Sequence, residues 1–161
     1  MNDVITTLTL LTEGLEKKKV KLAEIYDYTL AQDELLKADE FDLKSFNNII
    51  KNKQFRIDTV VQIDEGFQPT YERVRTFLEK NPDIYREYIE AMKRSIKEIG
   101  ELSIQIQVLE EKNYNRFKVV SSLMKDEVKT FRTNKKAVTN YYETYNKQQG
   151  SVRDNFFDSK K

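Results

Sequence analysis

The sequence predicts an all-α protein, an antiparallel bundle of three long helices with the third one longest. Apolar residues recur at steps of three or four over long stretches, which is the period of helices that pack along a seam. The 161 residues include only four glycines and two prolines, fewer than strands and tight turns require. The predicted boundaries are helices at about 3–37, 42–80 and 82–147 in one domain, 1–149, and a flexible C-terminal tail at 150–161.

The first helix, from about Asp3 to Lys37, carries one apolar stripe. Gly14 lies within it and costs about 1 kcal/mol relative to alanine, but the stripe continues past it. The stripe consists of Val4, Leu8, Leu11, Leu15, Lys18, Leu22, Ile25, Thr29, Gln32 and Leu36. A short corner follows, where Asp39 or Asp42 can accept hydrogen bonds from the free N–H groups of the next helix.

The second helix, from about Asp42 to Lys80, contains two helix-disfavouring residues, Gly66 and Pro69. Proline removes one backbone hydrogen bond and crowds the preceding turn. The apolar stripe keeps its phase on both sides, so we expect a kink and no chain reversal. The stripe consists of Phe46, Ile50, Lys53, Ile57, Val60, Asp64, Phe67, Tyr71, Val74 and Leu78.

The third helix begins at Asn81-Pro82-Asp83, where asparagine suits the cap, proline the first helical position and aspartate the positive helix end. Its stripe runs on with unchanged phase to about Lys147. Stripe members include Tyr85, Ile89, Met92, Ile96, Ile99, Ile106, Glu110, Asn113, Phe117, Val120, Met124, Phe131, Val138, Tyr141 and Tyr145.

Folding the chain at its two corners predicts a register. Lys18 comes within a turn of Asp64, and Lys53 comes beside Glu110, so charges within the stripes find opposite charges. The first helix ends near Lys37, which faces about Val119. Beyond that point the stripe has no partner within three helices, and it includes Val120, Leu123, Met124, Val128, Phe131, Val138, Tyr141, Tyr142 and Tyr145.

A bare apolar stripe of this length is unstable as an isolated helix in water. Three outcomes are open: the C-terminal part folds back as a fourth helix, it pairs with another copy of the chain, or it projects and frays until a partner covers it. The unbroken phase opposes a sharp reversal, yet Asn113-Tyr114-Asn115 is a poor helix-forming stretch that can hide one.

Composition weighs against several functions. The chain has no cysteine and no histidine, which removes thiolate chemistry and the commonest general base and metal ligand. The carboxylates alternate with lysine and arginine as on solvated helix faces. We therefore expect no catalysis, no cofactor and no metal.

Net charge and hydropathy indicate which classes of partner to expect. The net charge is +1, made of −4 over the first 117 residues and +5 from Lys118 onward. This basic segment is dilute and has no block of like charge, so we expect no nucleic-acid partner. No segment resembles a signal peptide or approaches the length of a membrane span. A cytoplasmic protein without stable membrane insertion is the expectation.

Four short segments, among them the corner Leu36–Leu43 with Phe46–Gln54 and the ending Phe156–Lys161, resemble FlgN-type flagellar export chaperones. The first corner, Leu36–Leu43 followed by Phe46–Gln54, is similar to the first corner of that family. The second corner, Asn81–Tyr85, and the segment Glu110–Asn113 before Phe117 also resemble it. The ending Phe156-Phe157-Asp158-Ser159-Lys160-Lys161 is similar to the family's tail, with Ser159 where a lysine is common. The resemblance spans nearly the whole chain through individually short motifs.

The resemblance implies a small cytoplasmic chaperone for flagellar type III export. Such a protein binds C-terminal helical segments of the hook-associated (junction) proteins, prevents their premature assembly and brings them to the flagellar export gate. A vacant apolar edge suits this role because it can hold a partner helix. The candidate client-binding residues are Val120, Met124, Val128, Phe131 and Val138. The alternative is that they form the core of a fourth helix or of a homodimer.

Candidate contacts with the export gate, or of the tail, are Tyr141, Tyr142, Tyr145, Phe156 and Phe157. The three tyrosines can equally close the helix end, and the two phenylalanines can be a short linear motif or an accidental apolar end. Two other functions stay open: a structural coiled-coil protein that homodimerises through the end of the third helix, and a basic-tailed binder of membranes or nucleic acid.

Overall fold

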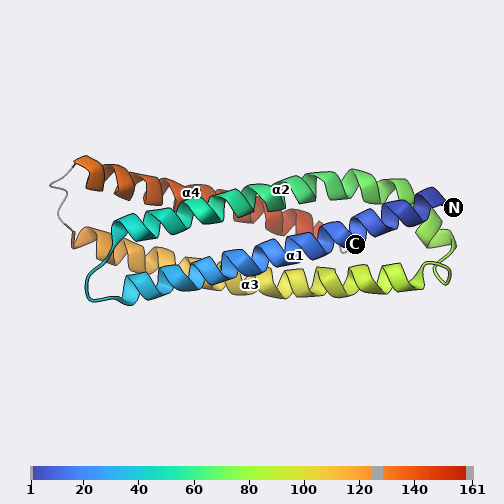
Figure 1. Cartoon of the computed structure of the whole chain (residues 1–161), viewed down its shortest axis with the longest axis horizontal. Helices are drawn as coiled ribbons and strands as arrows, with labels where there is room; N and C mark the ends of the chain where they lie inside the picture. Colours follow the sequence, from blue (N-terminus) through green and yellow to red (C-terminus); the bar gives the residue numbers. More distant parts are fainter. Residues whose placement is uncertain (1, 125–128, 159–161) are drawn as a thin grey trace. The chain divides into compact units, whose positions relative to one another are not determined.

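The computed structural model describes residues 2–124 and 129–158, and side chains within 3–124 and 131–147. Over the described residues the chain is helical and contains no strand. Figure 1 shows the four helices in chain order: α1 (Asn2–Lys37), α2 (Leu43–Lys80), α3 (Arg86–Ser122) and α4 (Lys129–Asp158). The predicted fold class is therefore confirmed as all-α. None of these helices, over the part described, has the apolar length needed to cross a membrane.

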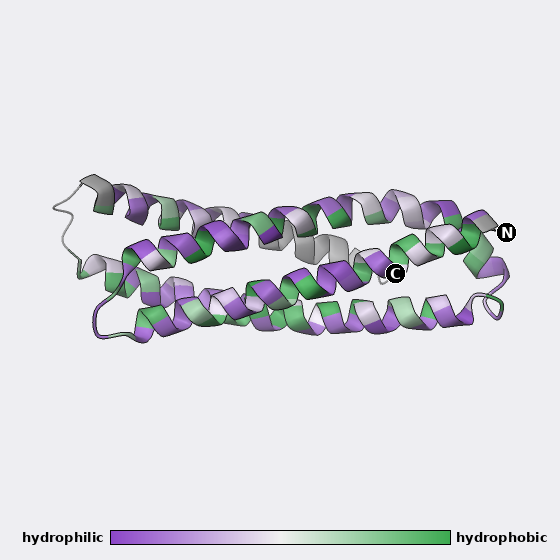
Figure 2. Cartoon of the chain, in the orientation of Figure 1, coloured by the Kyte–Doolittle hydropathy of each residue, from purple (hydrophilic) through white to green (hydrophobic). Residues whose placement is uncertain are grey.

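The chain divides into two compact units, and each helix of the first three contributes to both. Unit 1 comprises Met1–Leu30 and Asn52–Glu110. Unit 2 comprises Ala31–Lys51 and Glu111–Lys161. Along the helices of both units, hydrophobic positions recur among hydrophilic ones, as Figure 2 shows. This pattern gives each helix an apolar side to bury.

Unit 1 is a three-helix unit whose register follows from its polar contacts. Lys18 of α1 contacts Asp64 of α2 at 2.6 Å, and Lys53 of α2 pairs with Glu110 of α3. Both ion pairs were predicted from the corners of the sequence, and both are confirmed. The Lys53–Glu110 pair is buried, and its burial lowers the pKa of Lys53 well below the usual lysine value because desolvation disfavours the charged ammonium.

The core of unit 1 is made by the predicted stripes. Its buried apolar residues are Val4, Leu8, Leu11, Leu15, Leu22, Ile25, Val74, Leu78, Tyr85, Met92, Ile99 and Ile106. α2 stays helical through Pro69, as the unbroken phase predicted. Tyrosine and methionine fill the core beside the branched aliphatic residues, in keeping with close packing of a small helical unit.

Unit 2 has an aromatic core. The ring of Phe46 stacks on that of Phe117 with centroids 5.7 Å apart. The ring centroid of Tyr142 on α4 lies 5.9 Å from that of Phe117. Tyr142 also lies 5.1 Å from Tyr114. A polar contact joins α2 to α4, because the side-chain amide of Asn47 donates to Asn134 Oδ1 at 3.1 Å. The last turns of α3 are thus packed against α4 of the same unit.

The corner before α2 is capped by Asp42, one of the two residues predicted for this role. The backbone N–H of Ser45 donates to Asp42 Oδ1 at 3.0 Å, and the Ser45 hydroxyl donates to Oδ2 at 2.6 Å. These hydrogen bonds hold the pKa of Asp42 below its usual value, with the Ser45 hydroxyl as the largest cause. The cap fixes where the chain enters α2.

Helix boundaries after residue 81 differ from the predicted ones. α3 begins at Arg86 and not at 82, because residues 82–85 form turns. The continuous third helix predicted over 82–147 is wrong, since α3 ends at Ser122 and a separate helix begins at Lys129. The predicted flexible tail from residue 150 also differs, because α4 extends to Asp158. Of the three outcomes left open for the C-terminal part, the structure shows a separate fourth helix, whose Tyr142 packs against Phe117 of α3 within unit 2.

Candidate functional site

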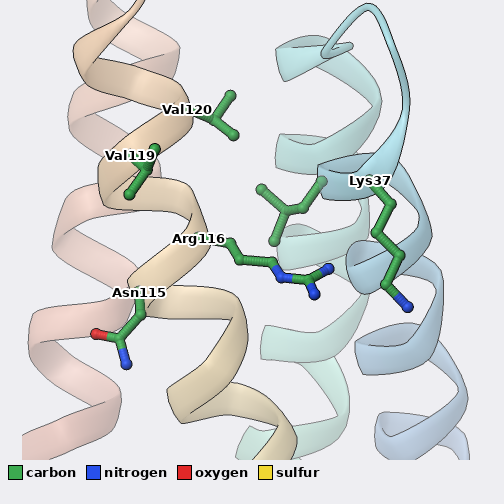
Figure 3. Close-up of a pocket in the computed structure, with 6 residues that line it drawn as sticks. Lys37, Asn115, Arg116, Val119 and Val120 are labelled. Carbon is green, nitrogen blue, oxygen red and sulfur yellow. The ribbon is translucent and has the colours of Figure 1, made fainter.

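The ends of α1 and α3 border an open groove in unit 2. Its volume is about 500 Å³. Six residues line it: Leu36, Lys37, Asn115, Arg116, Val119 and Val120. Figure 3 shows the side chain of Arg116 extending from α3 toward the helix that carries Lys37. We call this feature the α1–α3 groove.

Local hydrogen bonds tighten the last turn of α3 beside the groove. The hydroxyl of Ser122 donates to the carbonyl of Val119 at 2.7 Å, and that of Ser121 donates to the carbonyl of Lys118 at 3.2 Å. The N–H of Leu123 donates to the carbonyl of Val120 at 3.2 Å, three residues back. Such tightened last turns satisfy carbonyl groups that a helix end leaves without partners.

Large apolar side chains are exposed at this end of α3. Val119 is 62% exposed and Leu123 is 81% exposed. Val120 and Met124 are half-buried beside them. An isolated exposed leucine or valine is ordinary on a protein surface, whereas a cluster next to a groove marks a candidate binding site. Val119 and Val120 line the groove, and Leu123 and Met124 follow them in the chain. We call these four residues the apolar edge of the α1–α3 groove.

A buried carboxylate organises the charges of the groove. Asp33 is 7% exposed and accepts contacts from Lys37 at 2.8 Å and from Arg116 at 3.3 Å. The two cations are themselves roughly half exposed, with side-chain values of 45% and 38%. A buried carboxylate needs such partners, because an unpaired charge away from water is costly. Asp33 thus holds two cations at the wall of the groove.

The predicted client-binding residues fall into three environments. Val120 lines the groove, and Met124 follows at the end of α3. Phe131 is half-buried near the start of α4. Val138 is fully buried, so the expectation of a vacant apolar edge is wrong at this position. Val128 lies outside the described residues.

Burial at Val138 has a simple physical cause. The chain from Lys129 onward forms its own helix, and Val138, Tyr141 and Tyr142 of that helix are buried. The periodic stripe in the sequence belongs to two helices, and the second helix buries Val138, as expected from the alternative that this residue forms the core of a fourth helix.

The tyrosines predicted to contact an export gate are mostly interior. Tyr141 is 6% exposed and Tyr142 is 1% exposed, so neither is available as a surface contact, whereas Tyr145 is half-buried. Burial raises the pKa of both Tyr141 and Tyr142, because a phenolate would lose its hydration. Phe156 and Phe157 lie in the helical backbone of α4, and their side chains are outside the described part of the structure.

Of the six lining residues, only Val120 was predicted from the sequence as a binding residue. The other five are Leu36, Lys37, Asn115, Arg116 and Val119. One signal was present, since the predicted register placed Lys37 opposite about Val119. Arg116 had no comparable signal, because an arginine next to a buried aromatic is common on helix surfaces.

Comparison of the chain with protein-family models, with curated proteins and with solved structures gives no match. The chemistry of the site therefore has to be inferred from its own residues. An apolar edge beside two cations is suited to binding an amphipathic polypeptide segment.

Proposed function

We propose that this protein is a cytoplasmic, substrate-specific chaperone of flagellar type III export. In this proposal it binds C-terminal helical segments of the hook–filament junction proteins and prevents their premature assembly. Two lines support the proposal: the resemblance of the corners, the Glu110–Asn113 segment and the C-terminal ending to FlgN-type chaperones, and an all-helical architecture with an open groove.

The observation that carries the proposal is the apolar edge of the α1–α3 groove. Val119 and Leu123 expose most of their side chains to water next to a groove of about 500 Å³. Burying such surface contributes about 25 cal/mol per Å² of apolar area. A partner helix laid along the edge would gain this energy, and this is how helix-in-groove complexes form.

The binding face in this proposal is smaller than the sequence alone suggested. It consists of Val119, Val120, Leu123 and Met124, with Phe131 as a candidate extension. Val138 is excluded as a first contact because it is buried. Contact with the export gate stays a proposal for Tyr145, Phe156 and Phe157.

A matched pair of variants tests this function. Val119→Asp and Val108→Asp change the same residue type on the same helix at nearly equal exposure, 62% and 64%. The affinity for C-terminal segments of the junction proteins is measured by isothermal titration calorimetry. We expect Val119→Asp to weaken binding about tenfold or more, since a charge at a buried contact costs well over 1 kcal/mol. Val108→Asp should bind as the original chain does.

Two results would contradict the proposal. One is that the unmodified chain binds none of these segments. The other is that both variants lose affinity equally. A stable homodimer at nanomolar concentration that ignores the segments would instead support the structural coiled-coil alternative, and analytical ultracentrifugation of the same samples reports this.

A further inference from the structure

The charges that line the α1–α3 groove are all of one sign. Among its six lining residues, Lys37 and Arg116 are charged and both are cations. Asp39 and Glu40 lie in the exposed corner after α1, yet they do not line the groove. Lys118 is directed elsewhere, because its ammonium lies over the ring of Tyr114 at 4.6 Å. The groove therefore combines an apolar edge with a cationic wall.

We propose that the α1–α3 groove selects partner helices that present a carboxylate beside aliphatic side chains. This inference rests on the proposed function and specifies the chemistry of the segments that the groove accepts. The occupant is an amphipathic helix with an aspartate or glutamate placed one turn from the aliphatic residues that cover Val119 and Val120.

The contacts of Asp33 explain why a second carboxylate fits. Two cations share this one carboxylate, so the three side chains together carry one excess positive charge. Arg116 has five N–H donors in a planar group, and its Nη1 donates to Asp33 at 3.3 Å, a long hydrogen bond. A partner carboxylate can accept from the remaining N–H groups of the guanidinium, because the Arg116 side chain is 38% exposed.

Asp33 also prepares the site for binding. Because it is buried and contacts both cations, it restricts the two long side chains before a partner arrives. Restricting them beforehand reduces the conformational entropy that is lost on binding. A basic residue at the same place on a partner would face two cations, so the groove also disfavours basic segments.

The test combines protein and peptide substitutions. Arg116→Met and Lys37→Met remove one cation each and keep the apolar length. Arg75→Met is the control for loss of a carboxylate-paired arginine outside the groove, because Arg75 of α2 pairs with Glu72 and Glu79. The probes are the C-terminal junction-protein segment that binds most tightly and the same segment with its aspartates and glutamates replaced by asparagine and glutamine. Dissociation constants are measured over a series of NaCl concentrations.

We expect each groove variant to bind the acidic segment about fivefold more weakly, a change of about 1 kcal/mol that is typical of a partly exposed ion pair. The affinity of the unmodified chain should fall with salt, and this dependence should be flatter for the groove variants. The amide segment should bind the original chain more weakly, and its affinity should not respond to the variants. Arg75→Met should behave as the original chain.

The peptide substitution keeps the test valid where Arg116→Met weakens folding, because it leaves the protein unchanged. The inference is overturned where the acidic and amide segments bind equally, or where the salt dependence is identical for all proteins. Binding of the unmodified chain with either of these outcomes would leave the proposed function standing and refute only the charge selectivity. Absence of any binding by the unmodified chain would refute both.

Discussion

Lys53 of α2 and Glu110 of α3 form an ion pair in the interior of unit 1, with side chains 0% and 1% exposed. The hydroxyl of Thr29 on α1 lies 3.2 Å from the Glu110 carboxylate, so all three helices of unit 1 meet at this pair. Two buried charges are costly to desolvate, and their attraction offsets this cost only while both are present. The pair therefore aligns the helices more than it stabilises them.

The first prediction concerns this pair. Lys53→Met leaves the Glu110 carboxylate buried without its cation, and we expect the free energy of unfolding to fall by about 3–5 kcal/mol. The double variant Lys53→Met, Glu110→Met should regain most of that loss or exceed the original stability. Urea unfolding followed by circular dichroism measures both. Lys18→Met is the control at the more exposed Asp64 pair, with an expected loss of less than about 1 kcal/mol. A double variant as unstable as Lys53→Met would contradict this account.

The hydroxyl of Tyr142 is the subject of the second prediction. Tyr142 is 1% exposed, and its hydroxyl has no hydrogen-bond partner among the described residues. Burying this hydroxyl has a desolvation cost that no hydrogen bond offsets. Tyr142→Phe removes the hydroxyl, so we expect a gain of about 1 kcal/mol in unfolding free energy. Tyr71→Phe, at a half-buried tyrosine, should change stability by less than about 0.5 kcal/mol. A loss of stability in Tyr142→Phe would show that the hydroxyl has a partner.

Alkaline pH provides the third prediction. Burial raises the folded-state pKa of Tyr141 and Tyr142 above the unfolded value of about 10. The folded state then holds protons that the unfolded state releases, so stability is fully present below about pH 10 and falls as pH rises above it. The loss should be smaller in the variant Tyr141→Phe, Tyr142→Phe. Unfolding free energies of both proteins over a pH series, with tyrosinate absorbance as a second measurement, check this.

A comparison of the two proteins isolates the tyrosines. Hydrogen bonds to Glu98 and Glu16 raise the pKa of Lys19, which adds a loss of the same sign at high pH. Lys19 is unchanged in the variant, so its contribution cancels in the difference. Parallel pH curves for the two proteins would refute a role for the buried phenols.

The fourth prediction separates interior from surface on the original stripe. Val138→Asp places a carboxylate at a fully buried position, and we expect a loss of about 3 kcal/mol or more. Val119→Asp, at an exposed position, should stay within about 0.5 kcal/mol of the original stability. Thermal unfolding of the two variants measures the contrast. A comparably small loss in both would contradict the burial of Val138 and favour its alternative role as a client-binding residue.

The helical class, the two corners and the register of unit 1 could be predicted from the sequence, and the reason is visible in Lys18 and Lys53. Charged residues within an apolar stripe are rare, so their partners at Asp64 and Glu110 constrain the alignment of neighbouring helices. The corner cap at Asp42 was predictable for a similar reason, because a carboxylate just before a helix has one favoured role.

The break between α3 and α4 could not be predicted from the same pattern. Both helices bury an apolar face, and the steps of three and four happen to continue in phase across residues 122–129. No glycine or proline lies between Gly100 and Gly150 to mark a turn. The phase of a stripe records which side of a helix is apolar, and it does not record whether the axis reverses. Most of the groove was missed for another reason, because its residues Asn115, Arg116 and Val119 lie off the stripe.

The contact between Asn47 and Asn134 limits what can lie against this part of α2. Asn47 is 7% exposed, and its amide nitrogen has its acceptor 3.1 Å away on α4. If α4 slid by one turn, the Asn47 amide nitrogen would be buried without a hydrogen-bond acceptor, which would reduce the free energy of unfolding by about 1–3 kcal/mol. A helix from another protein that competes for the position of α4 would have to place an acceptor oxygen where Asn134 Oδ1 lies. The amide of Asn47 therefore selects against any helix that replaces α4 without a hydrogen-bond acceptor at this position, however hydrophobic that helix is.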